Sequence, residues 1–224
     1  MIERYFRAGV RLKWTFPAAV FGAWDGAIVD SRSPTPAMIY DGVDAQLVSP
    51  YTSVTTLGLA MRTPIQYHWL DYALGQTARL PIGPYDVLTG EMTGCLITQW
   101  SSAGVRFVGH VGTVTDKAQE NKTVKNTFAR GMSADVRGFN PAAAWDFGEI
   151  QTMLRSFKAS PQPKVLALVT TAGNFYSIVM LRLQPDVREP GLQLGRDWCV
   201  GGIKQVQPMN RDTLILELRK LRDT

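Results

Sequence analysis

The chain has 224 residues, of which 45% are hydrophobic and 19% are charged. A chain of this length and composition can bury a large core without disulfides or metals, which excludes a disordered protein and predicts one domain over residues 1–224. The formal net charge is +5 and the pI is near 9.3. Basic residues are scattered rather than clustered and no aromatic pattern is interleaved with them, so we expect no nucleic-acid partner.

Cysteine usage and hydropathy narrow the class further. Two cysteines, Cys95 and Cys199, are too few for a disulfide framework. This favours a protein of the reducing cell interior over an extracellular disulfide scaffold. The apolar run 16–24 is broken by Pro17 and Gly22 and is too short to cross a bilayer, so we expect no membrane span. It also lacks the form of a cleaved secretory signal.

The first third of the chain predicts short strands followed by one helix. Residues 37–40 and 45–48 have the composition of strands around an Asp41-Gly42 turn. Residues 65–74 carry apolar side chains at helical spacing and are followed by Gly75, a suitable helix C-cap.

The middle of the chain predicts a β-hairpin. Residues 96–100 and 105–110 are rich in β-branched and aromatic side chains, and residues 101–104 have the composition of a tight loop that ends in glycine. A loop of four residues would place Cys95 directly opposite His110 on one face of the sheet. A one-residue error in the loop would move the two side chains to opposite faces.

The last part of the chain predicts two helices and three strands. The expected helices are 117–130 and 140–158, the second with Asn140 as N-cap, and the expected strands are 165–171, 175–183 and 213–221. The fold class predicted from these elements is α/β: a single domain of mixed or mostly antiparallel, β-sandwich-like sheets with two or three outer helices.

Cys95 and His110 are the chemically notable pair in this pattern. A thiolate beside an imidazolium is a strong nucleophile that reacts rapidly near pH 6, and the imidazole can protonate a leaving amine. The alternative is a packed thiol beside a buried polar ring, with two inert cysteines. No phosphate loop, carboxylate pair or zinc spacing is present, and His68 has no ligand cluster around it, so we expect no cofactor and no metal.

The motif Thr93-Gly94-Cys95, followed by His110-Val111-Gly112-Thr113, resembles the catalytic domain of the cytotoxic necrotizing factors. These bacterial toxins deamidate a glutamine of small GTPases, and their signature is Leu-Ser-Gly-Cys followed by His-x-Gly-Thr. The motif also resembles the lethal-factor-type deamidase that acts on a translation initiation factor. A threonine is implicated in that relative, and Thr89 occupies the matching place. Residues 88–114 carry the resemblance, with Met92-Thr93 in place of Leu-Ser.

The resemblance implies a toxin or effector that deamidates a glutamine of a target protein, such as a small GTPase or a translation factor. In the mechanism that we expect for this pair, Cys95 attacks the carboxamide, His110 transfers protons, and the backbone N–H groups of Gly94 and Cys95 hold the oxyanion. Thr89 is the first candidate for the group that orients the imidazole, and a backbone carbonyl is the second. Such a protein would be exported without a cleaved signal and act in the target-cell cytoplasm, or else remain in the bacterial cytoplasm. The same pair would also serve a transglutaminase or a cysteine protease. A non-enzymatic interaction or immunity-type protein is the remaining alternative.

Substrate selection needs a larger surface than one glutamine side chain offers. The loop 81–86 and the polar loop 184–197 are candidate substrate-binding segments. The second carries Arg188 and Arg196, which would attract an acidic partner.

Overall fold

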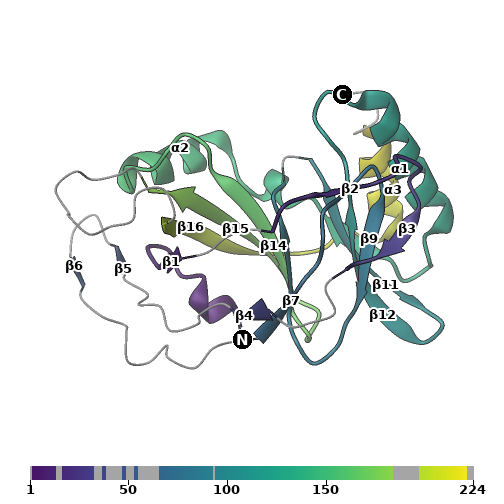
Figure 1. Cartoon of the computed structure of the whole chain (residues 1–224), viewed down its shortest axis with the longest axis horizontal. Coiled ribbons are helices and arrows are strands. Elements are labelled where there is room, and N and C mark those ends of the chain that lie inside the picture. The colour runs from purple at the N-terminus through teal and green to yellow at the C-terminus, as the bar shows by residue number, and fades with distance from the viewer. Residues whose placement is uncertain are drawn as a thin grey trace.

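A computed structural model gives the fold over most of the chain. It describes residues 2–13, 17–32, 37–38, 47–48, 53–54, 66–92, 94–183 and 197–220. This part of the chain forms two large β-sheets, two short strand pairs and three α-helices (Figure 1). Within it, no helix has both the length and the apolar character needed to cross a bilayer.

The two large sheets both mix parallel and antiparallel strand pairs. The larger sheet has seven strands, in the spatial order β1 (Arg11–Lys13), β16 (Asp197–Val206), β15 (Phe175–Arg182), β14 (Lys164–Val169), β10 (Val87–Gly90), β7 (Gln66–Trp69) and β4 (Ala37–Met38). The smaller sheet has five, in the order β13 (Arg137–Phe139), β11 (Leu96–Ser102), β12 (Val105–Val111), β9 (Thr77–Pro81) and β3 (Ile28–Asp30). Strand β10 runs parallel to β7, and β3 runs parallel to β9.

The remaining elements are short strands and helices. They are β2 (Val20–Phe21) paired with β8 (Ala73–Leu74), β5 (Leu47–Val48) paired with β6 (Ser53–Val54), the helices α1 (Ala118–Gly131), α2 (Phe147–Ser156) and α3 (Arg211–Lys220), and two 3-10 turns at Ile2–Tyr5 and Ala142–Ala144. The fold class predicted from the sequence, α/β with sandwich-like mixed sheets and outer helices, is confirmed.

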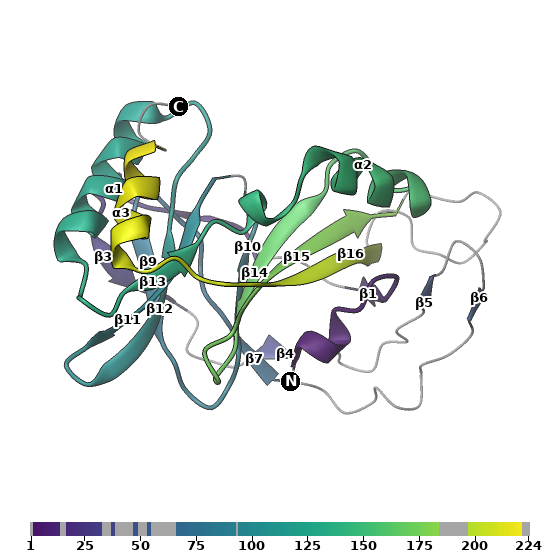
Figure 2. The same cartoon turned by 180° about the vertical axis from the view of Figure 1, so that it is seen from behind.

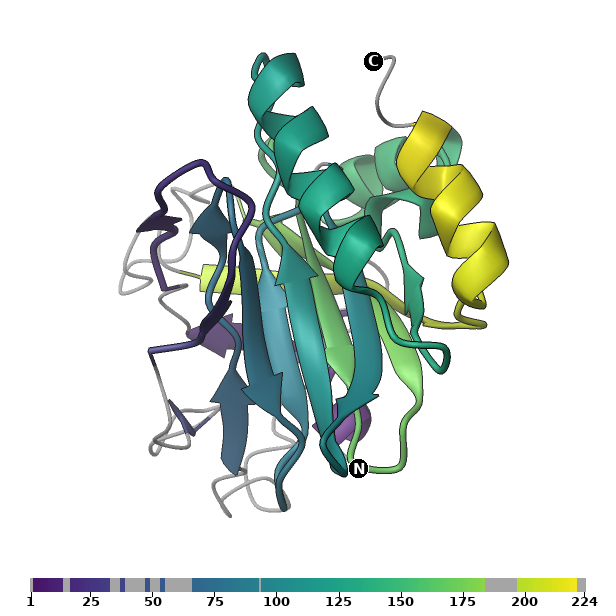
Figure 3. The same ribbon diagram turned by 90° about the vertical axis from the view of Figure 1, so that its right-hand side faces the viewer.

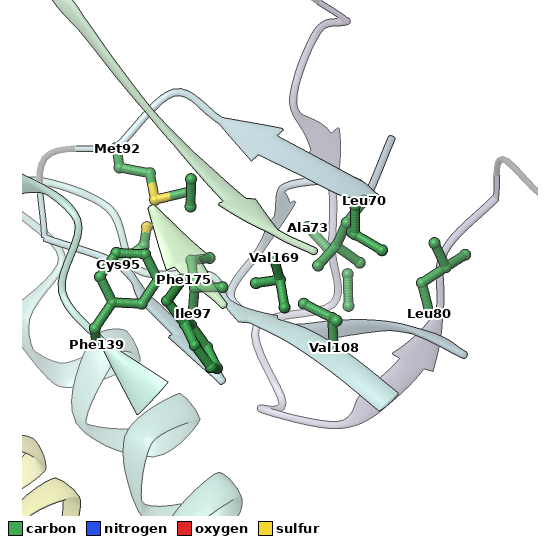
Figure 4. Packing of buried hydrophobic residues seen from close by; sticks show 13 residues of the cluster. Leu70, Ala73, Leu80, Met92, Cys95, Ile97, Val108, Phe139, Val169 and Phe175 are labelled. Carbon is green, nitrogen blue, oxygen red and sulfur yellow. The ribbon is translucent and has the colours of Figure 1, made fainter. Parts of the chain in front are cut away.

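The sheets pack face to face around a mainly apolar cluster (Figure 4). The larger sheet contributes Val87, Ala167, Val169 and Phe175 to it, and the smaller sheet contributes Ala78, Leu80, Ile97, Val108 and Phe139. Helices α1 and α3 lie together over the outer face of the smaller sheet (Figures 2 and 3). Helix α2 packs beside the larger sheet through Leu154.

Both helices predicted after the hairpin exist, although the second begins later than its sequence signal indicates. Helix α1 confirms the predicted helix 117–130 to within one residue at each end. Helix α2 begins at Phe147 because Asp146 and Glu149 form a capping box, in which each side chain accepts a hydrogen bond from the other residue's backbone N–H. Asn140 instead accepts from the N–H of Ala142 at 3.0 Å and starts a 3-10 turn.

The helix predicted at 65–74 is wrong. Strand β7 begins this segment and β8 ends it, with the buried side chains of Tyr67 and Trp69 on one face of β7. Polar and apolar side chains alternate along β7, as in a strand, but the apolar residues of the whole segment also fit helical spacing. Gly75 has a φ of 74° and lies in the turn between β8 and β9, so it does not cap a helix.

The last strand, predicted at 213–221, is also wrong, because α3 occupies this part of the chain. Leu214 and Leu218 are fully buried against the smaller sheet, whereas Leu216 is exposed. Leucines at every second position satisfy a strand pattern, but the pair four residues apart also forms one face of a helix. Asn210 starts the helix by accepting a hydrogen bond from the N–H of Thr213 at 3.0 Å.

The strands predicted at 37–40 and 45–48 are present in part as β4 and β5. They do not pair with each other: β4 lies beside β7, and β5 lies beside β6. The predicted Asp41-Gly42 turn lies outside the described residues. The strands predicted at 165–171 and 175–183 are confirmed as β14 and β15, with ends that differ by one or two residues.

The predicted hairpin is confirmed as β11 and β12, but its register is wrong by two residues. The loop contains only Ala103 and Gly104, with φ values of 48° and 77°, so Ser102 pairs with Val105. Positive φ at both central residues is the geometry of the tight turn that matches strand twist. Alanine is rare in this conformation, so the sequence did not indicate a two-residue loop. His110 therefore lies opposite Ile97 and not opposite Cys95.

A buried hydroxyl links the 3-10 turn at Ala142–Ala144 to the larger sheet and provides a test of this packing. Ser177 Oγ accepts from Trp145 Nε1 at 2.7 Å and donates to the carbonyl of Pro141 at 2.7 Å. We expect Ser177→Ala to lower the free energy of unfolding by about 1–3 kcal/mol, because Trp145 Nε1 would remain buried without an acceptor and the Pro141 carbonyl would keep only the longer hydrogen bond from the N–H of Ala144 at 3.3 Å. Chemical denaturation measures this loss. Ser102→Ala, at the exposed end of β11, should change stability by less than about 0.5 kcal/mol, and equal losses in the two variants would contradict the assignment.

Candidate active site

Thr89 and His110 form a hydrogen bond between the two sheets. Thr89 lies on β10 and His110 on β12, and the distance from Thr89 Oγ1 to His110 Nδ1 is 2.7 Å. Both residues are buried, with 1% and 0% exposed surface. Their strand neighbours, Ala167 beside Thr89 and Ile97 beside His110, belong to the apolar cluster between the sheets. The pair is thus a polar contact inside a hydrophobic layer, where an unpaired hydroxyl or ring nitrogen would be costly.

Tyr72 covers the imidazole of His110. The two rings are stacked, with centroids 4.8 Å apart and planes inclined by 8°. The phenol hydroxyl of Tyr72 donates a hydrogen bond to the carbonyl oxygen of Thr113. Tyr72 is thereby held at both ends, by the ring of His110 and by the backbone that follows β12.

Two neighbouring features fix the segment that carries Tyr72. Asp71 accepts hydrogen bonds from Ser31 Oγ at 3.0 Å and from the N–H of Arg32 at 2.7 Å. Gly112 passes so close to β8 that an added Cβ would lie 1.9 Å from the carbonyl oxygen of Ala73. Glycine at this position permits the approach that brings Tyr72 to Thr113.

Cys95 joins the same group of side chains through Thr113. Its Sγ lies 3.5 Å from the carbonyl oxygen of Thr113, to which it donates, and accepts from the Thr113 hydroxyl at 3.6 Å. The thiol is buried, with 1% exposed surface, and Figure 4 shows it near Met92 and Phe139 at one end of the apolar cluster.

The predicted direct pairing of Cys95 with His110 is wrong. Cys95 precedes β11, and the two-residue loop moves His110 to the position opposite Ile97. A shift by two residues keeps both side chains on the same face, so they become diagonal rather than facing neighbours. Within the described part of the chain, His110 Nε2 is buried without a hydrogen-bond partner. The thiol proton therefore faces Thr113 and not the imidazole.

Burial sets the protonation states of both groups. Loss of solvent lowers the pKa of His110 to about 3, so the imidazole is neutral throughout the physiological range. Loss of solvent also raises the pKa of the Cys95 thiol, and hydrogen bonds from Thr113 and Tyr72 and the positive charge of Lys125 oppose this only in part. The reactive thiolate–imidazolium pair expected from the sequence is thus absent in this closed arrangement, which holds a thiol and a neutral imidazole.

Gly94 provides space beside Cys95. A Cβ added to Gly94 would meet no atom of the described residues within 4 Å, whereas a Cβ on Gly109 would lie 2.4 Å from the ring of Trp100. Neither Gly94 nor Cys95 uses its backbone N–H in a hydrogen bond to another described residue. These are the two donors that the mechanism expected from the sequence assigns to the oxyanion.

Other residues considered from the sequence lie away from this site. Arg188 and Arg196 are outside the described residues, so the structure gives no position for them. In the loop 81–86, Asp86 is buried and accepts a hydrogen bond from the N–H of Thr171 at 2.8 Å. Cys199 is fully buried on β16. Among the described residues, no group of three or more His, Cys, Asp or Glu side chains is arranged to hold a metal ion.

Sequence reasoning missed Tyr72 and Thr113. Tyr72 was hidden because the segment that carries it was interpreted as a helix, so nothing related it to His110. Thr113 is the last residue of the His-Val-Gly-Thr motif, which was quoted without a role for its threonine. The motif was the available signal, since a residue two positions after the end of β12 has to lie near the cysteine that precedes β11.

Comparison with known proteins identifies no relative of this chain. No protein-family model, curated protein or solved structure matches the chain.

The neutral, buried state of His110 predicts a pH dependence of stability. Unfolding returns the pKa of His110 from about 3 to its ordinary value near 6.5, so the unfolded chain binds the extra proton between these values. His110 therefore makes the protein less stable as the pH falls below 6.5, by about 1 kcal/mol per pH unit. We expect His110→Asn, which keeps a polar atom near Thr89, to flatten the dependence of unfolding free energy on pH between 6.5 and 4.5.

A matched variant separates this effect from that of His68, whose pKa burial also lowers. His68 is only half-buried, so His68→Asn should flatten the same slope less than His110→Asn does. Urea denaturation at a series of pH values measures both slopes. A slope that His110→Asn leaves unchanged would contradict the assignment.

Proposed function

We propose that the protein is a cysteine hydrolase that deamidates a glutamine side chain of a target protein, with Cys95 as nucleophile, His110 as acid and base, and Thr89 as the residue that orients the imidazole. The glutamine, the protein target and a role as bacterial toxin or effector come from the resemblance of residues 88–114 to the deamidase toxins. The cysteine–histidine chemistry is supported by the geometry around His110.

The hydrogen bond between Thr89 Oγ1 and His110 Nδ1, at 2.7 Å, is the observation that carries the proposal. It joins two residues from different sheets, and the resemblance implicates both of them independently of this contact. In the proposed reaction Nδ1 carries the proton and donates it to Thr89, so Nε2 has the lone pair of a general base. Nε2 has no partner among the described residues and is therefore available to a proton donor.

The reaction proceeds in two steps. Cys95 Sγ gives its proton to His110 Nε2 and attacks the carboxamide carbon, and the backbone N–H groups of Gly94 and Cys95 bind the resulting oxyanion. The C–N bond breaks as His110 returns the proton to the departing ammonia, which leaves a thioester. His110 then takes a proton from water as the oxygen attacks the thioester carbonyl. The C–S bond breaks, and His110 returns this proton to Cys95 Sγ, which leaves glutamate and the Cys95 thiol.

The closed arrangement requires one rearrangement before this chemistry. Cys95 has to exchange its contact with the Thr113 carbonyl for His110 Nε2, and the substrate has to reach a thiol that is fully buried. Tyr72 contacts both the ring of His110 and the Thr113 carbonyl, so displacement of Tyr72 would free His110 and Thr113 together. Low thiol reactivity of the free protein at pH 6 is therefore compatible with activity, provided that the substrate opens the site.

The activity is tested by incubating the protein with a host-cell lysate and searching by mass spectrometry for glutamines whose mass increases by about 1 Da. We expect Cys95→Ser to abolish the modification, because a serine hydroxyl is far less acidic than a cysteine thiol and is a poorer nucleophile here. Thr89→Val, which removes only the hydroxyl, should lower the rate by about 10²-fold or more through misorientation of His110. Thr89→Ser should retain most of the rate.

Cys199→Ser is the matched control for the nucleophile, since Cys199 is equally buried but lies on β16, in the other sheet from β11. A modification that persists in Cys95→Ser and disappears in Cys199→Ser would overturn the assignment. Crosslinked products or cleaved peptide bonds that depend on Cys95 would instead identify a transglutaminase or a protease.

Gly94 allows a test that leaves the catalytic side chains intact. Because an added Cβ meets open space, we expect Gly94→Val to fold with a thermal midpoint within a few degrees of the original. The same side chain would occupy the space through which the substrate approaches Cys95, so deamidation should fall by at least about 10-fold. Calorimetry and the mass-spectrometric assay measure the two effects. Unchanged activity in a stable Gly94→Val protein would show that the substrate does not approach from this side.

The alternative function is a non-enzymatic interaction or immunity-type protein, and complete burial of Cys95 and His110 favours it. In that case the Thr89–His110 pair serves only to join the sheets. The two functions differ in their dependence on Gly94 and Cys95, because an interaction protein would bind its partner equally well with Gly94→Val and Cys95→Ser.

A further inference from the structure

A cavity of about 310 Å³ lies at the end of the smaller sheet, away from the Cys95 site. It is lined by Gln99, Trp100, Ser101, Arg106, Asp135 and Arg137. Gln99 and Trp100 are buried, whereas Arg106 and Asp135 are exposed, so the cavity has a buried floor and a charged rim. Its volume is at the lower end of the range for small-ligand sites.

Gln99 lines this floor and has a side-chain donor without a hydrogen-bond partner among the described residues. Its Oε1 accepts hydrogen bonds from two nitrogens of Arg137, with Nε at 2.8 Å. A guanidinium can only donate, so this contact fixes which end of the amide is oxygen and leaves the NH₂ group on the opposite side. Nε2 is buried without a hydrogen-bond partner among the described residues, in a residue with 3% exposed surface. A buried NH₂ group of this kind costs stability until an acceptor binds to it.

The charges around the cavity favour a single negative charge. Arg106 and Arg137 are two cations, and Asp135 is one anion. The carboxylate of Asp135 accepts hydrogen bonds from the N–H of Ser101 at 3.2 Å and from Ser133 Oγ at 2.6 Å. Hydrogen bonding with the side chain of Ser101, and then with that of Ser133, lowers the pKa of Asp135 to about 2, so it stays ionised. The cavity therefore has a net charge of one positive unit, which suits a carboxylate better than a doubly charged phosphate.

We propose that this cavity binds one carboxylate group, with the Gln99 amide and the Arg106 guanidinium as donors. A planar carboxylate accepts from two donors at once, and a guanidinium pairs with it through charge-assisted hydrogen bonds that are often bidentate. Arg137 holds Gln99 in the required orientation and is a positioning residue. The carboxylate belongs either to a free small acid or to an acidic side chain of a partner protein.

The site is separate from the proposed catalytic residues. The guanidinium of Arg137 lies over the ring of Phe175, 5.3 Å from its centroid, and Phe175 packs edge-on against Phe139. These two rings and Ile97 belong to the apolar cluster that also includes Cys95, so hydrophobic side chains fill the space between the two sites. The proposal consequently stands or falls independently of the deamidase activity.

The test uses the whole protein and follows the side-chain NH₂ signals of Gln99 in ¹H–¹⁵N correlation spectra. The probes are N-acetylglutamate N-methylamide, its neutral glutamine counterpart, propionate and inorganic phosphate. We expect saturable shifts of the Gln99 signals with the glutamate probe and none with the glutamine probe. Tighter binding of the glutamate probe than of propionate indicates an acidic side chain of a partner, and equal binding indicates a free acid. A stronger effect of phosphate would overturn the preference for a carboxylate.

Two variants separate binding from folding. Gln99→Glu keeps the acceptor that Arg137 holds but replaces the NH₂ donor by an oxygen, so the protein should fold and lose binding of the glutamate probe. Because the Gln99 signals are lost in this variant, backbone amide shifts of Ser101 and Arg106 report its binding. Arg106→Gln should weaken binding by about 10-fold or more. Arg155→Gln, which removes an exposed charge on α2, should leave binding unchanged. Binding by Gln99→Glu as tight as by the original protein would overturn the proposal.

Discussion

The hydrogen bond between Thr89 and His110 joins the two large sheets across their buried interface. It forms only if β10 of the larger sheet and β12 of the smaller sheet face each other in one register, because both side chains are enclosed by apolar neighbours. The tight turn at Ala103 and Gly104 fixes the register of β12. A packing of the sheets that separated Thr89 from His110 would leave both polar groups buried without a partner, which would cost stability.

The sequence predicted the class of the fold and the identity of the central strands, because β-branched runs and helix signals there are strong. It failed where one pattern serves two structures. Leu214, Leu216 and Leu218 satisfy a strand by alternation, while the first and last also satisfy a helix, and only the outer face of the smaller sheet decides between them. The loop of the hairpin failed for a local reason, since Ala103 adopts a conformation that alanine rarely takes. Even so, the error of two residues preserved the face shared by Cys95 and His110.

The site itself was predictable only as far as its motif residues. Thr89 was named from a resemblance, and its contact with His110 across two sheets has no signature in local spacing. Tyr72 was unpredictable because its role arises from the close passage of Gly112 beside Ala73. The protonation states were also beyond sequence reasoning, because adjacent residues suggested an ion pair whereas burial favours two neutral groups. In the closed site, Cys95 and His110 therefore have the protonation states of an inactive form of the proposed enzyme. Open space lies beside Cys95 at Gly94.

The proposed chemistry depends most directly on a neutral His110 whose Nδ1 is hydrogen-bonded to Thr89, and nitrogen NMR of protein labelled with ¹⁵N-histidine measures this state. We predict that the two ring nitrogens of His110 keep the distinct shifts of one neutral tautomer, with the proton on Nδ1, from pH 8 to pH 5. Thr89→Val should change the Nδ1 shift without titrating the ring. A His110 signal that titrates near pH 6.5, or a proton on Nε2 with an unbonded Nδ1, would contradict the account.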